Sequence, residues 1–322
     1  MDNMLDVILS TDFLFTAIRV MTPILFAALA CMVFTKGGID SIGTEGIMLL
    51  CALAGPLGSY ATNSPFAGVI IAMITGAVFS CLFGYVTIFL KSEPVLAGIA
   101  LNTLASGLTI FVIYYVTGEK GSTQSLASPT VPNADIALLK EIPFLGQIFS
   151  GHSILTYLGL LLTVLLGLFF YKTPAGLRIR SVGENPQAAM SVGVSVIKYQ
   201  YMALILAGAL CGLGGAYMSM SYVSFFSKEM IAGRGFIGMA AESMGRGTPW
   251  GVALSALLFG AADSLAIRLQ LLQLPPQLIQ TIPYVITIAA IALYSHSRWK
   301  QKKQNGFSKG IKALCDKNSN RS

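Results

Sequence analysis

The chain is a succession of apolar runs separated by short polar segments. Eight of the runs hold between 13 and 25 residues, and a helix needs about 20 residues to cross a bilayer. Because the runs are continuous and do not alternate between apolar and polar positions, they predict helices and not the strands of a barrel. The nine candidate membrane segments are residues 13–34, 42–60, 66–90, 94–116, 152–171, 199–220, 236–244, 250–272 and 282–294.

The seventh segment, residues 236–244, is unusually short. Two Gly-Arg-Gly triplets, residues 233–235 and 245–247, flank it. So short a segment crosses a membrane only if its polar flanks are buried in protein, so a crossing segment and a re-entrant or broken one both remain open. In a topology of nine crossings, the two triplets lie on opposite sides of the membrane.

The composition supports a membrane location. Hydrophobic residues make up 54% of the chain and charged residues 11%, with a mean hydropathy of +0.71, whereas a soluble domain carries about a quarter charged residues. We predict an all-α polytopic membrane protein, a bundle of about eight to ten transmembrane helices with one short cytoplasmic helix. Residues 1–294 form the transmembrane domain, with an outer loop at 117–151 and a cytoplasmic loop at 173–198, and residues 295–322 form a basic tail.

The net charge of +7 comes from the end of the chain. From Ser295 onward there are eight Lys or Arg residues and one acidic residue, Asp316. Such a tail is typical of a cytoplasmic anchor at the lipid surface, and we expect no nucleic-acid binding. With the 173–198 loop in the cytoplasm, 15 Lys or Arg residues lie inside and 6 outside. The chain is therefore expected in a plasma membrane, with its N-terminus outside and its C-terminus in the cytoplasm.

The sequence offers no group of residues suited to catalysis or metal binding. The five cysteines form no CxxC pair, and the only histidines, His152 and His296, have no companions for a metal or a nucleophile. No GxxxxGK[ST] motif occurs, so the chain has no P-loop for ATP. We expect no catalytic residue, metal site or bound cofactor here, and any energy from ATP has to come from a partner.

The cytoplasmic loop carries the signals of a short helix. Asn185 is a favourable N-cap, Pro186 suits the first helical position, and Gly193 ends a run of about two turns that includes Ala188 and Ala189. A stiff polar element between two apolar runs is what an external motor needs in order to act on a membrane protein.

Charged and flexible residues precede this helix. Glu184 lies near its N-terminus, where the helix dipole favours a carboxylate, and Gly183 permits a tight turn. Arg178 and Arg180 have two open interpretations: they pair with acidic groups of a partner or with lipid headgroups, or they only mark the cytoplasmic side.

Three motifs together resemble a known family. They are GLRIRSVGENPQAA followed by GV (residues 176–194), GALCGLGG (208–215) and GRGFIGMA (233–240). The chain resembles the permease subunits of bacterial ABC importers in the branched-chain amino acid, ribose and nucleoside group, and most of all the shorter permease of nucleoside importers. The resemblance covers roughly residues 20–294.

The resemblance implies a function and a set of partners. The helix beginning at Asn185 would be the coupling helix, seated in a groove of a cytosolic ABC ATPase that binds ATP and Mg. A second homologous permease and an extracytoplasmic substrate-binding lipoprotein would complete the complex in the bacterial plasma membrane. Within the group, a sugar or branched-chain amino acid permease is an alternative to a nucleoside permease.

Polar residues within the apolar runs are candidates for the translocation path, because each costs a few kcal/mol unless it faces protein or water. The candidates are Glu45, Asn102, Thr103 and Ser106. For Glu45 and Asn102 the alternative is a structural hydrogen bond between helices. An ion-coupled secondary transporter, a different class of function, would use Glu45, Glu242 or Asp263 as ion sites.

Two further sets of residues are expected to stabilise the bundle. Glu242 and Asp263 are expected to pair with Arg246 and Arg268 at helix ends. A face of small residues allows close helix packing, either within the subunit or against the partner permease; it consists of Gly208, Gly212 and Gly215.

Overall fold

The computed structural model describes residues 11–40, 42–119, 121–134, 148 and 150–270. This part of the chain is helical and contains no strand, only isolated bridges between Ser122 and Ser227 and between Asn133 and Ser153. The elements are α2 (Thr11–Lys36), α3 (Thr44–Thr62), α4 (Pro65–Gly84), the π-helical η1 (Tyr85–Phe89), α5 (Pro94–Thr117), α8 (Ile154–Lys172), α9 (Pro174–Glu184), α10 (Pro186–Ser191), α11 (Val196–Tyr217), the π-helical η2 (Met218–Tyr222), α12 (Arg234–Met244) and α13 (Pro249–Gln270).

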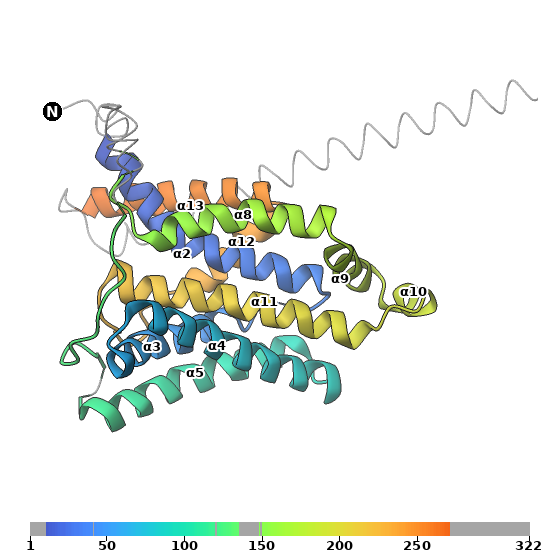
Figure 1. The fold of residues 1–322 in the computed structure, drawn as a ribbon, viewed down its shortest axis with the longest axis horizontal. Helices are drawn as coiled ribbons and strands as arrows, with labels where there is room; N and C mark the ends of the chain where they lie inside the picture. The colour runs from blue at the N-terminus through green and yellow to red at the C-terminus, as the bar shows by residue number, and fades with distance from the viewer. Residues whose placement is uncertain (1–10, 41, 120, 135–147, 149, 271–322) are drawn as a thin grey trace, which may run out of the picture.

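The long helices run side by side, and α9 and α10 project from one end of the bundle (Figure 1). We call this end, where α2 and α8 finish and α11 begins, the α10 end. The opposite end holds the start of α2, the end of α5 and the start of α8. The predicted all-α polytopic architecture is confirmed, with six helices long and apolar enough to cross a membrane.

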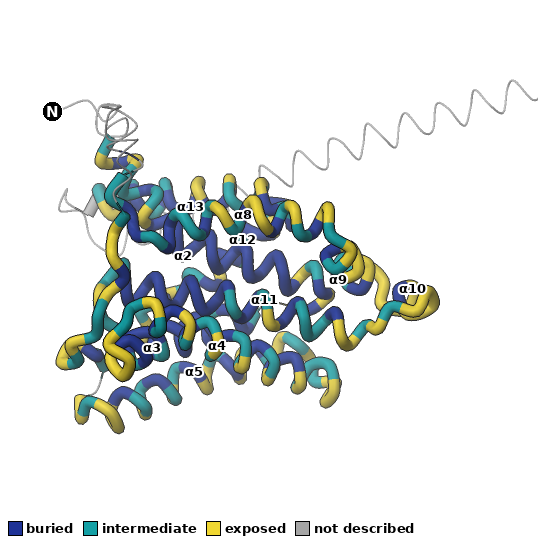
Figure 2. Tube along the Cα trace, viewed as in Figure 1, coloured by how far each residue is buried: buried dark blue, intermediate teal, exposed yellow. Residues whose placement is uncertain are grey.

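The centre of the bundle is formed by α2 and α11. Within their most apolar windows, 89% of α2 and 78% of α11 is buried, against 28% for α5. A helix that is apolar all round has to be covered by other helices or by lipid. Protein therefore covers the two central helices, while α4, α5 and α8 lie at the outside of the bundle, with many exposed residues (Figure 2), and carry exposed large apolar side chains.

The glycine face of α11 packs within the subunit. A Cβ at Gly208 would collide with the carbonyl oxygen of Gly76 on α4, and a Cβ at Gly212 would collide with Met73 on the same helix. Gly215 lies in the same way against the backbone of α3. Since α4 and α11 are in backbone contact here, Ser80 Oγ can donate to the carbonyl of Leu204 at 2.7 Å.

The short seventh segment, predicted at residues 236–244, forms a helix of about half the length needed to cross a bilayer. Its 11 residues in α12 span about 16 Å, roughly half of a hydrocarbon core of about 30 Å. Gly235 at its start touches Glu45 at the start of α3, and Gly247 beyond its end lies beside Lys36 at the α10 end. The two Gly-Arg-Gly triplets are therefore separated by about half the thickness of a hydrocarbon core, and the side of the membrane that each one faces stays a prediction.

The remaining predicted segments are the second candidate helix, which is α3, and segments near or beyond the ends of the described ranges. The 19 residues of α3 are long enough to cross but are less apolar than the six helices above. The ninth candidate segment at 282–294, the basic tail at 295–322 and residues 120, 135–147 and 149 of the outer loop lie outside the described residues.

We predict that Gly208→Ala lowers the free energy of unfolding by about 1–3 kcal/mol, the usual cost of overpacking, because its Cβ meets the backbone of Gly76. Gly107→Ala is the matched control, since nothing lies within 4 Å of a Cβ there. Thermal unfolding of the two purified variants in detergent measures the difference. Equal melting temperatures would contradict the close packing of α4 and α11.

Candidate functional site

The loop between α8 and α11 contains two helices where the sequence predicted one. Thr173 caps α9 by accepting a hydrogen bond from Gly176 N at 3.2 Å, and Pro174 follows at the first helical position. This is the same cap-and-proline signal that marks α10, and it was overlooked in the sequence. The loop is therefore a rigid pair of helices.

The predicted start of α10 is confirmed. Asn185 Oδ1 accepts a hydrogen bond from Ala188 N at 3.0 Å, and Pro186 occupies the first helical position. The helix ends at Ser191, just before Gly193, whose φ of +81° suits glycine.

The surface of α10 points away from the bundle (Figure 2). Met190 is 63% exposed and Val192 just beyond the helix is 78% exposed, whereas Ala189 is buried beneath them. Ala188 is exposed on the same surface. An exposed apolar tip on a projecting helix is suited to contact with another protein.

The two arginines of α9 contact neighbouring helices of the same chain. Arg178 Nη1 donates to Tyr199 Oη of α11 at 2.7 Å, and Arg180 lies over the ring of Tyr171 at the end of α8. Arg180 also forms an ion pair with Glu184 at 3.7 Å. These contacts fix α9 against the ends of α8 and α11.

Gly183 fixes α9 against the end of α2. A Cβ at this position would collide with the carbonyl oxygen of Lys36 and would lie 2.9 Å from Gly38 N. Gly38 has a φ of +74° and lies against Gly183 in return. Only two residues without side chains allow this contact.

Lys36 brings three elements together at the α10 end. Its ammonium group interacts electrostatically with Arg180 and Glu184 of α9 and with Glu242 of α12. The sequence suggested Arg246 as the cation for Glu242, and the structure places Lys36 beside this carboxylate. In the same way the sequence suggested Arg268 as the cation for Asp263, and the structure shows an electrostatic interaction of Asp263 with Arg234.

A cavity of about 350 Å³ lies where α3, α5 and α12 meet. Three of the four predicted path residues line it, namely Glu45, Asn102 and Ser106. Thr103 does not, because it is exposed and its hydroxyl donates to Ile99 O within its own helix. The remaining lining residues are Gly46, Leu49, Glu229, Ile231, Ala232, Gly233 and Phe236.

Glu45 holds the start of α12. Its two carboxylate oxygens accept hydrogen bonds from Gly233 N at 2.8 Å and from Gly235 N at 2.7 Å. The first backbone N–H groups of a helix have no partner within the helix and carry partial positive charge, so a carboxylate satisfies both requirements. Glu45 lines the cavity and also makes structural hydrogen bonds between helices, which the sequence analysis gave as the alternative to a role in the translocation path.

Asn102 holds the start of α3 in a similar way. Its Oδ1 accepts from Gly46 N at 2.8 Å, and its Nδ2 donates to Ile42 O at 3.1 Å. Two of the four side chains predicted for the path, Glu45 and Asn102, therefore use their hydrogen bonds on backbone groups at or near helix starts.

The sequence analysis missed the segment that enters the cavity before α12. Glu229, Ile231 and Phe236 contribute to the lining. The one sequence feature that points to this segment is the Gly-Arg-Gly triplet at 233–235. It indicates that the backbone comes close to a neighbour, but not that the residues around it line a cavity.

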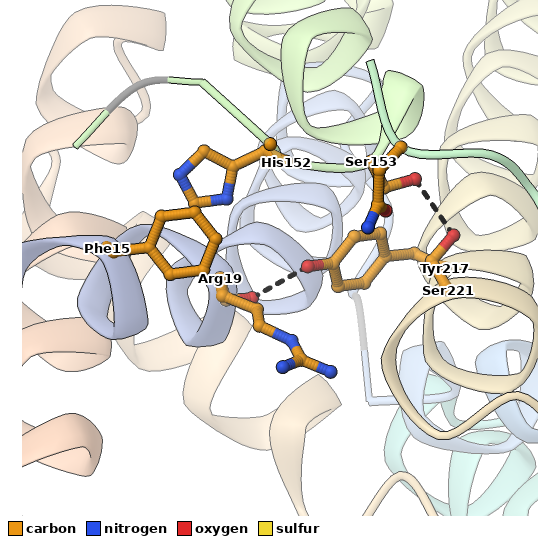
Figure 3. A pocket seen from close by; sticks show the side chains of 8 residues that line it. Phe15, Arg19, His152, Ser153, Tyr217 and Ser221 are labelled. Atoms are coloured by element: carbon orange, nitrogen blue, oxygen red, sulfur yellow. Dashed lines mark hydrogen bonds between the residues drawn. The ribbon is translucent and has the colours of Figure 1, made fainter. Parts of the chain in front are cut away.

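A second, smaller pocket of about 100 Å³ lies at the opposite end of the bundle (Figure 3). Arg19 donates to Tyr222 O at 3.0 Å, and the ring of His152 stacks on Phe15 at 4.2 Å. Burial of the imidazole lowers the pKa of His152, and Arg19 lowers it further. Nearby Ser153 and Ser221 are joined by a hydrogen bond of 2.9 Å. These contacts tie α2, the residues just before α8, and η2 together.

In the described part of the chain, no cluster of three or more His, Cys, Asp or Glu residues is suited to a metal ion.

We predict that Glu45→Ala lowers the free energy of unfolding by about 2–3 kcal/mol, because it leaves two backbone N–H groups of α12 without their charged acceptor. Glu45→Gln, which keeps one acceptor, should cost roughly half as much. Thr103→Ala is the control and should change the value by less than about 0.5 kcal/mol. Thermal unfolding in detergent tests this, and equal effects of Glu45→Ala and Thr103→Ala would refute the role of the carboxylate.

Comparison with known proteins identifies the family. Residues 13–291 match the family described as the permease component of the branched-chain amino acid transport system. The nucleoside ABC transporter permease protein NupC of Lactococcus lactis is 34% identical over 85% of this chain and 89% of its own length. The guanosine ABC transporter permease protein NupQ of Bacillus subtilis is 34% identical over 84% of this chain and 87% of its own length.

A more distant relative and one solved structure are also similar to this chain. A putative glucose ABC transporter permease protein of Haloferax volcanii is 29% identical over 85% of this chain and 89% of its own length. Among solved structures, PsaBC from Streptococcus pneumoniae in complex with Fab has a similar fold, with a TM-score of 0.51 and 13% identity over 86% of this chain and 90% of that chain. The chain belongs to the branched-chain amino acid transport system permease family, and it is a membrane permease subunit of an ABC transporter.

Proposed function

We propose that the chain is the permease subunit of an ATP-driven importer that carries nucleosides across a bacterial plasma membrane. The observation that carries the proposal is the α9–α10 pair, which projects from the bundle (Figure 1) and contacts both central helices, α2 through Gly183 and α11 through Arg178. The two relatives named for nucleosides or guanosine, each 34% identical over most of the chain, support the substrate class.

In this proposal α10 is the coupling helix. Its exposed tip, with Met190 and Val192, would sit in a groove of a cytosolic ABC ATPase, which binds ATP and Mg. The absence of a P-loop motif from this sequence agrees with hydrolysis on a separate subunit.

Movement of α10 would reach the cavity through a backbone contact, an electrostatic interaction and hydrogen bonds. Gly183 of α9 abuts the backbone of Lys36, and the Lys36 side chain interacts with Glu242 near the end of α12. The other end of α12 is bonded to Glu45 at the cavity. A half-length helix held at both ends is an element that can transmit a displacement without changing its own fold.

The remaining partners follow from the orientation proposed for the bundle. The α10 end would face the cytoplasm, and the opposite end would receive an extracytoplasmic substrate-binding lipoprotein. A second homologous permease would cover part of the apolar outer surface, and membrane lipid the rest.

The cavity favours a nucleoside over a sugar or an ion. Its size lies at the low end of the range of about 300–1,000 Å³ that is typical of small-molecule sites, and it combines apolar walls at Leu49, Ile231 and Phe236 with a few polar groups. A base needs such walls, whereas a sugar needs polar groups on all sides. For ion coupling, Glu45 would have to release the start of α12 in each cycle.

We predict that Gly183→Ala reduces the ATPase that copurifies with the permease, and ATP-dependent nucleoside uptake, by about tenfold, because the added Cβ displaces α9 from Lys36. Asn185→Ala should have a smaller effect, since losing an N-cap costs about 1 kcal/mol. Gly107→Ala is the control with open space around its Cβ.

Affinity purification from cells expressing the complete complex measures the retained ATPase. The proposal fails if uptake continues without any ATPase and collapses when the proton gradient is removed, because this result identifies an ion-coupled carrier.

A further inference from the structure

The polar groups around the cavity divide into two sets. Glu45 and Asn102 are bonded to backbone groups at helix starts. Within the described part of the chain, the Glu229 carboxylate and the Ser106 hydroxyl have no hydrogen bond or ion pair. The second set is therefore available to a molecule in the cavity.

The backbone holds Glu229 in an unusual conformation. Its φ is +54°, in the left-handed region that residues with a Cβ rarely adopt, and Ala232 nearby has a φ of +50°. Glycine or asparagine would adopt this conformation more easily. Backbone strain of this kind is concentrated at functional sites, where the surrounding structure imposes it.

Both ends of the strained segment are fixed. At one end Thr123 Oγ1 accepts a hydrogen bond from Phe226 N at 2.9 Å, and at the other Glu45 accepts from Gly233 N at 2.8 Å. Between them the turn is closed by Ala232 N, which donates to Glu229 O at 3.1 Å. Glu229, an exposed residue, thus lines the cavity from a backbone that is hydrogen-bonded on both sides.

The chemistry next to Glu229 indicates which ligand it recognises. Phe236, 47% exposed, lines the same cavity and offers an aromatic face for a base. A carboxylate has two parallel acceptor oxygens and pairs best with two neighbouring N–H donors. Guanine has such a pair, N1–H and the exocyclic amine; hypoxanthine has N1–H alone, and adenine has an acceptor at N1.

We propose that Glu229 is a specificity-determining residue that accepts hydrogen bonds from the N1–H and exocyclic amine of a guanine-type nucleoside while Phe236 packs against the base. This inference rests on the proposed function, import of nucleosides, and names a substrate preference that the permease itself imposes.

Uptake of guanosine, inosine, adenosine and uridine by the complete complex in cells tests the assignment. The rate for each nucleoside in the Glu229→Gln variant is divided by the rate in the unaltered complex, so that selection by the binding protein cancels. Guanosine uptake should fall about 10- to 100-fold, the usual effect of losing hydrogen bonds to a charged group. Inosine uptake should fall less, and adenosine and uridine uptake should change less than about twofold.

Three comparisons make the result decisive. Glu229→Asp, which keeps the charge and tolerates a positive φ, should retain most guanosine uptake. Glu119→Gln removes an exposed carboxylate that does not line the cavity and should have no effect. ATPase stimulation by the loaded binding protein shows that each variant is folded and coupled.

An unchanged guanosine rate in Glu229→Gln, or an equal fall for all four nucleosides, would overturn the role of Glu229 and leave the proposed function standing. Import of none of the four by the unaltered complex would overturn the proposed function, and the assignment with it.

Discussion

The structure depends on the two hydrogen bonds through which Glu45 holds the start of α12. A helix that begins within the bundle leaves its first backbone N–H groups without a partner in the helix, and such groups need an acceptor from elsewhere in the protein. The carboxylate of Glu45 accepts from Gly233 and Gly235 and places its negative charge at the positive end of the helix. Without this acceptor a half-length helix in the bundle would be unfavourable, and the cavity beside it would lose one of its walls.

The second constraint is close helix packing at glycines. At two positions a glycine allows the backbones of neighbouring helices to touch, and we propose that movement of α10 passes through such contacts. The contact between Gly183 and Lys36 joins the projecting α9–α10 pair to α2, while Gly208 and Gly76 join α11 to α4. Packed backbones have few alternative arrangements, so a displacement at one end shifts whole helices. This property suits a subunit that receives its energy from outside the membrane.

The sequence predicted local features better than distant ones. Continuous apolar runs were sufficient for the helical membrane class, and the cap at Asn185 could be identified because its signal lies within four residues. Asn102 and Ser106 are four residues apart and share a helix face, whereas Thr103 is turned by about 100° from Asn102. Because Thr103 is also three residues from Ser106, helical periodicity alone could not exclude it. The acceptor role of Glu45 could not be predicted, because its donors are 188 and 190 residues away in sequence.

The central claim is that movement of α10 reaches the cavity through α2 and α12. Spin labels at Ala232, before α12, and at Ser106 of α5, which both line the cavity, report the distance between these two walls by pulsed electron resonance in the complete complex. The account predicts that the distance between the labels changes when ATP binds to the ATPase and that Gly183→Ala abolishes this change even in complexes that retain the ATPase. An equal change on ATP binding with and without Gly183→Ala would contradict it.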